Sequence, residues 1–271
     1  MTAFWMQALS CRLASIAAAR HLLLCADYDG TLAPIAPRPE EARLLPGVFD
    51  LLNELAHLPY TRVAIISGRS LENLRSHSGF ERPVLLVGSH GAELPDDVSD
   101  RNHPQGLDLL EAIESALLRI CETAVGAWLE RKPYGMAVHV RQVIVPDADR
   151  VLMQVRKELT RWPSVRVKEG KAVLELSLSN ANKGEAVTRL RNDWGTDPQV
   201  LYLGDDVTDE DAFVALRPAD LGVKVGLGPS KAKYRVASEH EALNILQFLF
   251  KNRSSLGGGF TEGQKIRGSG A

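Results

Sequence analysis

Residues 22–32 read Leu-Leu-Leu-Cys-Ala-Asp-Tyr-Asp-Gly-Thr-Leu. The apolar run at 22–26 is typical of a buried strand, and the polar residues after it stop that strand in a turn. Side chains two apart on an extended backbone share a face, so Asp27 and Asp29 can point into one site. Gly30 lets the chain turn away without a Cβ clash. The stretch therefore predicts an inner strand that ends in a pair of carboxylates.

The segments on either side of this stretch alternate between helix and strand patterns. Leu51, Leu52 and Leu55 lie on one face of a predicted helix over 46–57. Four further buried strands are predicted, at 62–66, 84–87, 200–203 and 222–225. This alternation implies parallel strands with right-handed crossovers, in which ligands gather beyond the carboxyl ends of the strands. We therefore expect the polar residues that follow these strands to converge on one site.

The middle of the chain has a different pattern. A predicted helix at 107–124 precedes a hairpin of 127–132 and 136–141, and a second helix and strand pair follow at 148–162, 165–168 and 172–178. This α-β-β-α-β-β order predicts a small inserted cap with an open sheet. We assign 1–106 and 183–250 to an α/β core and 107–182 to the cap. The glycine-rich and polar end, 251–271, is predicted to be a disordered tail.

The first chemical motif is the carboxylate pair of Asp27 and Asp29. Phosphate-ester hydrolysis needs a nucleophile and a group that protonates the leaving oxygen, and two coupled carboxylates suit both tasks. The same residues are also good turn formers. A calcium-binding loop opens similarly, but Arg38 stands where the final glutamate of such a loop would fall.

Two weaker motifs carry groups that could hold a phosphoryl group. Ser67 follows a predicted strand and precedes a helix, where backbone N–H groups favour anions. Lys183 opens another helix and could offset negative charge in a transition state. Taken alone, the Ser67 motif is more typical of a loop, and the Lys183 motif of a surface lysine that caps a loop.

The segment 204–211 holds five acidic residues in seven positions after a buried strand. So dense a run of negative charge repels itself unless a cation neutralises it, although acids also favour the first turn of a helix. Both explanations can apply at once. Asp205 and Asp206 would then face a metal, and Glu210 and Asp211 would stabilise the first turn of the helix. Oxygen ligands beside a phosphate predict Mg²⁺.

Taken together, these motifs resemble the four motifs of haloacid dehalogenase-like phosphatases, in the same order. The spellings Asp27 to Leu32, Ile66 to Ser70, Gly88 to Glu93 and Gly204 to Phe213 are similar to the trehalose-6-phosphate phosphatase family. In the cap, the resemblance extends to Glu130-Arg131-Lys132, His139-Val140-Arg141, Glu169-Gly170-Lys171 and Leu174-Glu175-Leu176. It runs from about Leu22 to Leu249. It implies a Rossmann-like core of the haloacid dehalogenase type with an α/β cap.

The resemblance also implies a role for each matched residue of the core. Asp27 would be the nucleophile and a metal ligand. Asp29 would be the acid/base and lend its backbone carbonyl to the metal, and Asp205 would complete the protein ligands. Ser67 and Lys183 would hold the phosphoryl group, and Lys183 would assist catalysis.

In the cap, the resemblance implies that four charged residues hydrogen-bond sugar hydroxyls: Glu130, Arg141, Lys171 and Glu175. A disaccharide has many hydroxyls and little apolar surface, which suits charged donors and acceptors. Without the resemblance, these four would read as exposed strand residues. The expected activity is Mg²⁺-dependent hydrolysis of trehalose-6-phosphate, in trehalose biosynthesis, through an aspartyl-phosphate. The alternatives are a phosphatase for another sugar phosphate, such as sucrose-6-phosphate or mannosyl-phosphoglycerate, and a non-catalytic regulatory domain.

Composition narrows the possible partners. A formal net charge of −2 excludes a strongly basic nucleic-acid binder. The partner that the resemblance implies is a small sugar phosphate. Three widely separated cysteines without C-x-x-C spacing fit a reducing compartment, so we expect a cytoplasmic protein. We also expect a monomer. The apolar stretch near the N-terminus is too short to span a bilayer and repeats at helical spacing, which predicts a surface helix and no membrane partner.

Overall fold

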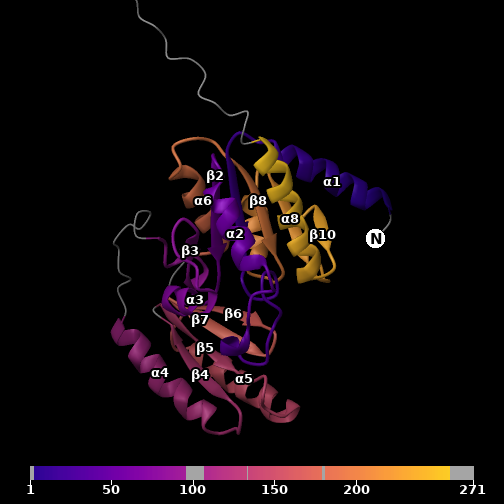
Figure 1. The fold of residues 1–271 in the computed structure, drawn as a ribbon. Helices are drawn as coiled ribbons and strands as arrows, with labels where there is room; N and C mark the ends of the chain where they lie inside the picture. The colour runs from indigo at the N-terminus through magenta and orange to yellow at the C-terminus, as the bar shows by residue number, and fades with distance from the viewer. Residues whose placement is uncertain (1–2, 96–106, 133, 179–180, 257–271) are drawn as a thin grey trace, which may run out of the picture.

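The computed structural model describes residues 3–95, 107–132, 134–178 and 181–256. Its larger sheet has six parallel strands in the order β10-β9-β8-β1-β2-β3 (Figure 1). These strands are β1 (Leu22–Ala26), β2 (Thr61–Ile66), β3 (Leu85–Val87), β8 (Gln199–Gly204), β9 (Leu221–Val225) and β10 (Tyr234–Val236). The prediction of a parallel α/β core is confirmed, and β10 is a strand that the sequence did not indicate.

Helices cover both faces of this sheet. They are α1 (Ala3–Ala17), α2 (Val48–His57), α3 (Leu71–Ser78), α6 (Lys183–Asn192), α7 (Asp209–Ala215) and α8 (Glu239–Leu256), with short 3₁₀ turns at Pro39–Glu41 and Ser89–Gly91. Alternate residues of β1 enter two separate apolar clusters. Leu22 and Leu24 pack with α1, α2 and α8, whereas Leu23 and Cys25 pack with α6 and α7. Because both faces are covered, β1 is buried along its whole length.

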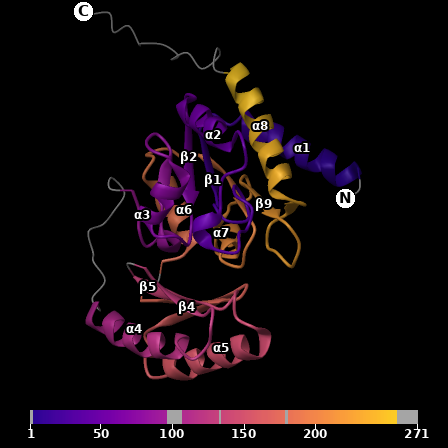
Figure 2. The same cartoon turned by 60° about the horizontal axis from the view of Figure 1, so that its bottom comes forward.

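The second sheet is antiparallel and has its own core. Its strands β4 (Trp128–Lys132), β5 (Gly135–His139), β6 (Arg166–Gly170) and β7 (Val173–Ser177) lie in the order β4-β5-β7-β6. Helices α4 (Leu107–Cys121) and α5 (Val145–Leu159) pack on one face of this sheet. The other face turns toward the parallel sheet (Figure 2). All these elements lie within the predicted insertion, and we refer to them as the cap.

The predicted tail is partly wrong. Helix α8 continues to Leu256, so residues 251–256 belong to the core, and Arg253 is buried in it. The Arg253 guanidinium donates hydrogen bonds to Thr61 Oγ1 and to the carbonyls of Ala17 and Ala19. Residues 257–271 lie outside the described part of the chain. Among the described residues, no helix is both long and apolar enough to cross a membrane.

The strand register sets the position of the chemical motifs. Ala26 lies opposite Ile65 of β2 and Leu203 of β8 in two parallel pairings. The residues that follow these strands, Asp27, Ser67 and Asp205, therefore leave the sheet at the same edge. That edge faces the cap, as Figures 1 and 2 show.

Helices α6 and α7 pack closely because Gly184 has no side chain. A Cβ at this position would collide with the carbonyl oxygen of Asp211 and lie 3.2 Å from the Cβ of Ala215. Lys183 begins α6 and Asp209 begins α7, so this helix contact holds the two residues next to each other.

We expect Gly184→Ala to lower the free energy of unfolding by about 1–3 kcal/mol, because the methyl group overpacks the α6–α7 contact. Urea denaturation followed by circular dichroism measures this change. The exposed Arg189 on the same helix gives the control, Arg189→Ala, which should stay within about 0.5 kcal/mol of the parent. Equal stability of the Gly184→Ala and parent proteins would contradict the close-packing argument.

Candidate active site

A buried lysine stands between two carboxylates at the centre of the site. Lys183 Nζ lies 2.9 Å from Asp27 Oδ1 and 2.8 Å from Asp209 Oδ1, and all three side chains are almost completely buried. Burial acts to lower the pKa of Lys183, but the two carboxylates outweigh it and raise that pKa. Lys183 is therefore a fixed positive charge against Asp27, and the predicted reach of this lysine to that carboxylate is confirmed.

Asp209 is a site residue that sequence reasoning missed. Its Oδ1 also accepts a hydrogen bond from Tyr202 Oη at 2.7 Å, and its Oδ2 accepts the backbone N–H groups of Asp205 and Asp206, each at 2.9 Å. One carboxylate thus shapes the acidic loop and holds Lys183. The usable signal was position, because Asp209 is the first residue of a helix that starts four residues after Asp205.

Three carboxylates form a group that could hold a metal ion. One oxygen each of Asp27, Asp205 and Asp209 lies within 4.8 Å of the others. Asp205 Oδ1 is buried and has no hydrogen-bond partner among the described residues. Burial and the charge of Asp209 raise the pKa of Asp205 to about 7. Burial also raises the pKa of Asp27, with Asp209 and Asp205 adding to the effect and Lys183 opposing it.

Such a set fits a divalent cation, because a cation would partner the orphaned oxygen and offset the repulsion between the carboxylates. The structure therefore brings Asp27 and Asp205 together, as the predicted metal site requires. Asp206, which the sequence also placed toward a metal, is half-buried and is not one of the three grouped carboxylates.

The second carboxylate of the first motif is held by an arginine. Arg69 donates from Nε to Asp29 Oδ2 and from Nη2 to Asp29 Oδ1, both at 2.7 Å. The guanidinium is 5% exposed, so the two-pronged pair is shielded from water on the arginine side. The sequence did not indicate this role of Arg69, because a sequence alone does not show which carboxylate an arginine contacts. Ser67 is buried beside it, and its Oγ accepts the Arg69 backbone N–H at 3.2 Å.

The four predicted sugar-binding residues line the same pocket as the residues of the core motifs. Glu130 Oε2 lies 2.9 Å from His139 Nε2, inside the cap sheet. Arg141 donates to the carbonyl of Ala36, in the core loop that follows the first motif. Lys171 lies exposed at the turn between β6 and β7. The structure thus gathers all four around one opening.

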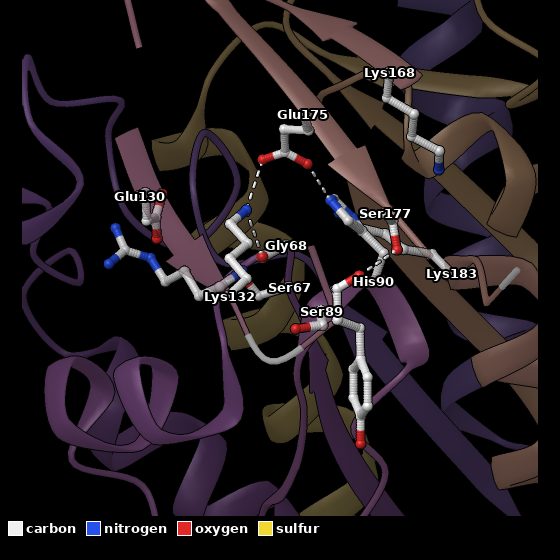
Figure 3. A network of polar contacts seen from close by, with 12 residues as sticks. Ser67, Gly68, Ser89, His90, Glu130, Lys132, Lys168, Glu175, Ser177 and Lys183 are labelled. Carbon is white, nitrogen blue, oxygen red and sulfur yellow. Dashed lines mark hydrogen bonds and ion pairs between the residues drawn. The ribbon is translucent and has the colours of Figure 1, made fainter. Parts of the chain in front are cut away.

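Glu175, the fourth of these residues, lies in a polar network that joins cap and core (Figure 3). Its Oε1 is 2.7 Å from Lys132 Nζ, and its Oε2 is 2.8 Å from His90 Nε2. Burial acts to raise the pKa of Glu175, but Lys132 and His90 outweigh it and hold the pKa well below its usual value. Lys132 also donates to the carbonyl of Gly68 at 3.0 Å. Sequence reasoning gave neither Lys132 nor His90 a place in the site, since both contacts cross between segments far apart in the chain.

We expect Asp205→Asn to raise the thermal midpoint of the metal-free protein at about pH 8, because it removes a buried charge whose pKa the fold has raised. The gain should shrink as the pH falls below about 7, where the folded protein already keeps Asp205 protonated. Calorimetry with a chelator measures both effects.

The same variant should lose the rise in thermal midpoint that Mg²⁺ gives the parent, because one carboxylate ligand is gone. Asp211→Asn, at an exposed position in the same acidic run, is the control and should retain the Mg²⁺ response. If Mg²⁺ does not change the thermal midpoint of the parent protein, that result would argue against a metal at this site.

The chain is similar to known proteins in sequence and in fold. A family profile described as trehalose-phosphatase matches residues 25–242. Trehalose-6-phosphate phosphatase of Escherichia coli is 32% identical over 232 residues, which cover 82% of this chain and 84% of that protein. The C-terminal domain of Candida albicans trehalose-6-phosphate phosphatase superposes with a TM-score of 0.78 at 25% identity, over 89% of this chain and 96% of that one.

A haloacid dehalogenase-like hydrolase from Bacteroides thetaiotaomicron has a TM-score of 0.59 at 16% identity, covering 84% of this chain and 99% of that one, a likeness of fold alone. The expected fold, a parallel α/β core with an inserted α/β cap, is confirmed by these two likenesses. With a profile match across most of its length, the chain belongs to the trehalose-phosphatase family.

Proposed function

We propose that this protein hydrolyses trehalose-6-phosphate to trehalose and phosphate, with Mg²⁺ and through an aspartyl-phosphate on Asp27. Family membership supports the reaction class. The observation that carries the proposal is one pocket with two ends. Asp27, Lys183 and Asp205 line the end at the parallel sheet, and polar cap side chains such as Glu130 line the other.

The metal would be held by Asp27 and Asp205, with Asp209 beside them and the backbone carbonyl of Asp29 as a further ligand. Bound Mg²⁺ would stabilise negative charge on the phosphoryl oxygens. The chain supplies the matching positive charge itself through Lys183, which is buried and fixed by Asp209 on its far side. Ser67 would donate its hydroxyl to a phosphoryl oxygen, since it lines the same pocket.

Asp27 would attack phosphorus, because of the two carboxylates in the first motif it is the one that lies against the fixed charge of Lys183. Asp29 would protonate the leaving sugar oxygen and then take a proton from the attacking water. In the structure both Asp29 oxygens accept hydrogen bonds from Arg69. A carboxylate has about four acceptor positions, so Arg69 can hold the orientation of Asp29 while a position stays open for the transferred proton.

The cap, residues 107–182, would close over the sugar, and the core, 1–106 and 183–250, would carry the chemistry. Glu130, Arg141, Lys171 and Glu175 would hydrogen-bond the sugar hydroxyls, for which charged donors and acceptors are suited. The bonds from the cap to the Ala36 and Gly68 carbonyls hold this lid against the core, which would exclude bulk water during transfer.

The three cysteines are free thiols, two of them buried. That is consistent with a reducing compartment, so we further propose a cytoplasmic location. The expected monomer stays a prediction.

The direct test is phosphate release from trehalose-6-phosphate, sucrose-6-phosphate and mannosyl-phosphoglycerate, each with Mg²⁺ and with chelator. We expect trehalose-6-phosphate to give the highest kcat/KM, and chelation to abolish turnover. A higher kcat/KM on another sugar phosphate would replace the substrate assigned here. Absence of turnover on all three would leave a non-catalytic domain as the better interpretation.

Substitutions of the two carboxylates of the first motif should impair different steps of the reaction. Asp27→Asn should keep the fold but form no covalent phosphoenzyme, because the amide is a poor nucleophile. Asp29→Ala should lower kcat by about 10²–10⁴-fold, the usual contribution of a general acid/base. Rapid acid quench after mixing with substrate labelled in its phosphoryl group detects the first effect. Steady-state assays detect the second. Unchanged turnover in Asp29→Ala would refute the acid/base role.

A further inference from the structure

The Gly88–Glu93 segment is one of the motifs that are similar to the trehalose-6-phosphate phosphatase family. Its turn is held in an unusual conformation, with φ of +47° at Ser89, +55° at His90 and +106° at Gly91. Left-handed backbone costs energy for a residue with a side chain, and two such residues in succession need support from their surroundings.

That support comes from the end of strand β2. The Ser89 N–H donates to the Arg69 carbonyl at 2.7 Å, and the His90 N–H donates to the Ser67 carbonyl at 2.9 Å. The Ser89 hydroxyl also donates to Glu93 Oε1 at 2.6 Å. The strained turn is thus fixed to Ser67 and Arg69, two residues of the second motif.

The turn aims the His90 side chain out of the core and at the cap. The imidazole packs over Gly68, where a Cβ would lie 2.5 Å from His90 Cε1. Its Nε2 reaches Glu175 Oε2, and Lys132 joins the other Glu175 oxygen to the Gly68 carbonyl. Figure 3 shows the resulting ring of contacts, in which two cap residues close onto two core residues.

Within this ring His90 is a hydrogen-bond donor. Burial lowers the pKa of His90 despite the opposing effect of Glu175, so the neutral imidazole has one N–H. Nε2 faces a carboxylate and therefore carries that proton, while Nδ1 has no partner among the described residues. A carboxylate has about four acceptor positions, and the two contacts with Lys132 and His90 leave Glu175 able to accept from a ligand as well.

We propose that His90 is a positioning residue that acts through Glu175: from the core, it orients this cap carboxylate toward a sugar hydroxyl. The inference rests on the proposed function. Because His90 is fixed to the Ser67–Gly68 segment, Glu175 reaches this orientation only when the cap is seated on the core. Sugar recognition is thereby coupled to the segment that would grip the phosphate. A phosphate ester without a sugar gains nothing from the contact.

Two substitutions separate the hydrogen bond from the backbone turn. His90→Asn suits the left-handed backbone but is too short to reach Glu175. His90→Gln places an amide N–H where Nε2 lies and restores the donor. His57→Asn, at an exposed position on α2, is the matched control.

We expect His90→Asn to lower kcat/KM for trehalose-6-phosphate by about 10–100-fold, the usual effect of losing a hydrogen bond to a charged group. Hydrolysis of p-nitrophenyl phosphate should stay within about twofold, because that ester has no sugar for Glu175 to bind. His90→Gln should recover most of the lost kcat/KM for trehalose-6-phosphate. His57→Asn should leave kcat/KM unchanged for both substrates. Thermal midpoints of all variants show whether the fold is intact.

A double-mutant cycle with Glu175→Ala decides whether His90 acts through Glu175. In the Glu175→Ala background, His90→Asn should cause no further loss on trehalose-6-phosphate. An additive loss, or equal losses on both substrates, would overturn the inference while leaving the proposed function standing. A parent protein that does not hydrolyse trehalose-6-phosphate would remove both.

Discussion

The site depends on one buried ammonium group held between two carboxylates. Lys183 joins Asp27 at the end of β1 to Asp209 at the start of α7, and its own position at the start of α6 is fixed where that helix packs on α7. Three carboxylates this close would repel one another strongly in a medium that screens charge poorly. The lysine offsets part of that repulsion, and the orphaned oxygen of Asp205 marks where further positive charge would act. The same imbalance that makes the metal-free site costly makes it suited to binding a cation and a phosphate together.

The two sheets differ in where their polar side chains lie. Strands β1, β2 and β8 of the parallel sheet are mostly apolar and buried, so the fixed charges of the site concentrate beyond their carboxyl ends. The antiparallel sheet packs one face on α4 and α5 and leaves the other face free to carry polar side chains toward the core. The contacts that cross between the sheets, from Lys132, His90 and Arg141, are polar and directional. These polar contacts hold the cap in one position on the core.

The core motifs could be placed from sequence because their geometry is local. Asp27, Ser67 and Asp205 each follow an apolar run, and parallel strands bring such positions to one edge. The partners of these residues could not be placed in the same way. Arg69 and Asp29 are forty residues apart, and His90 and Glu175 are eighty-five apart. Asp209 could not be told apart from the acids beside it in the sequence. The structure distinguishes it, because it is the residue at which α7 begins.

The sequence by itself determined the alternation of strands and helices, the inserted cap and the convergence of the acidic motifs, since these follow from hydrophobic periodicity and chain direction. Only the tertiary structure decided which charges pair. It also corrected the end of the chain: residues 251–256 look polar enough for a tail, yet Arg253 is buried because carbonyls from distant segments receive its guanidinium. Strand β10 is likewise too short for periodicity to reveal, and it forms because β9 offers it an open edge. Such features arise from contacts between distant segments, and a linear pattern does not record them.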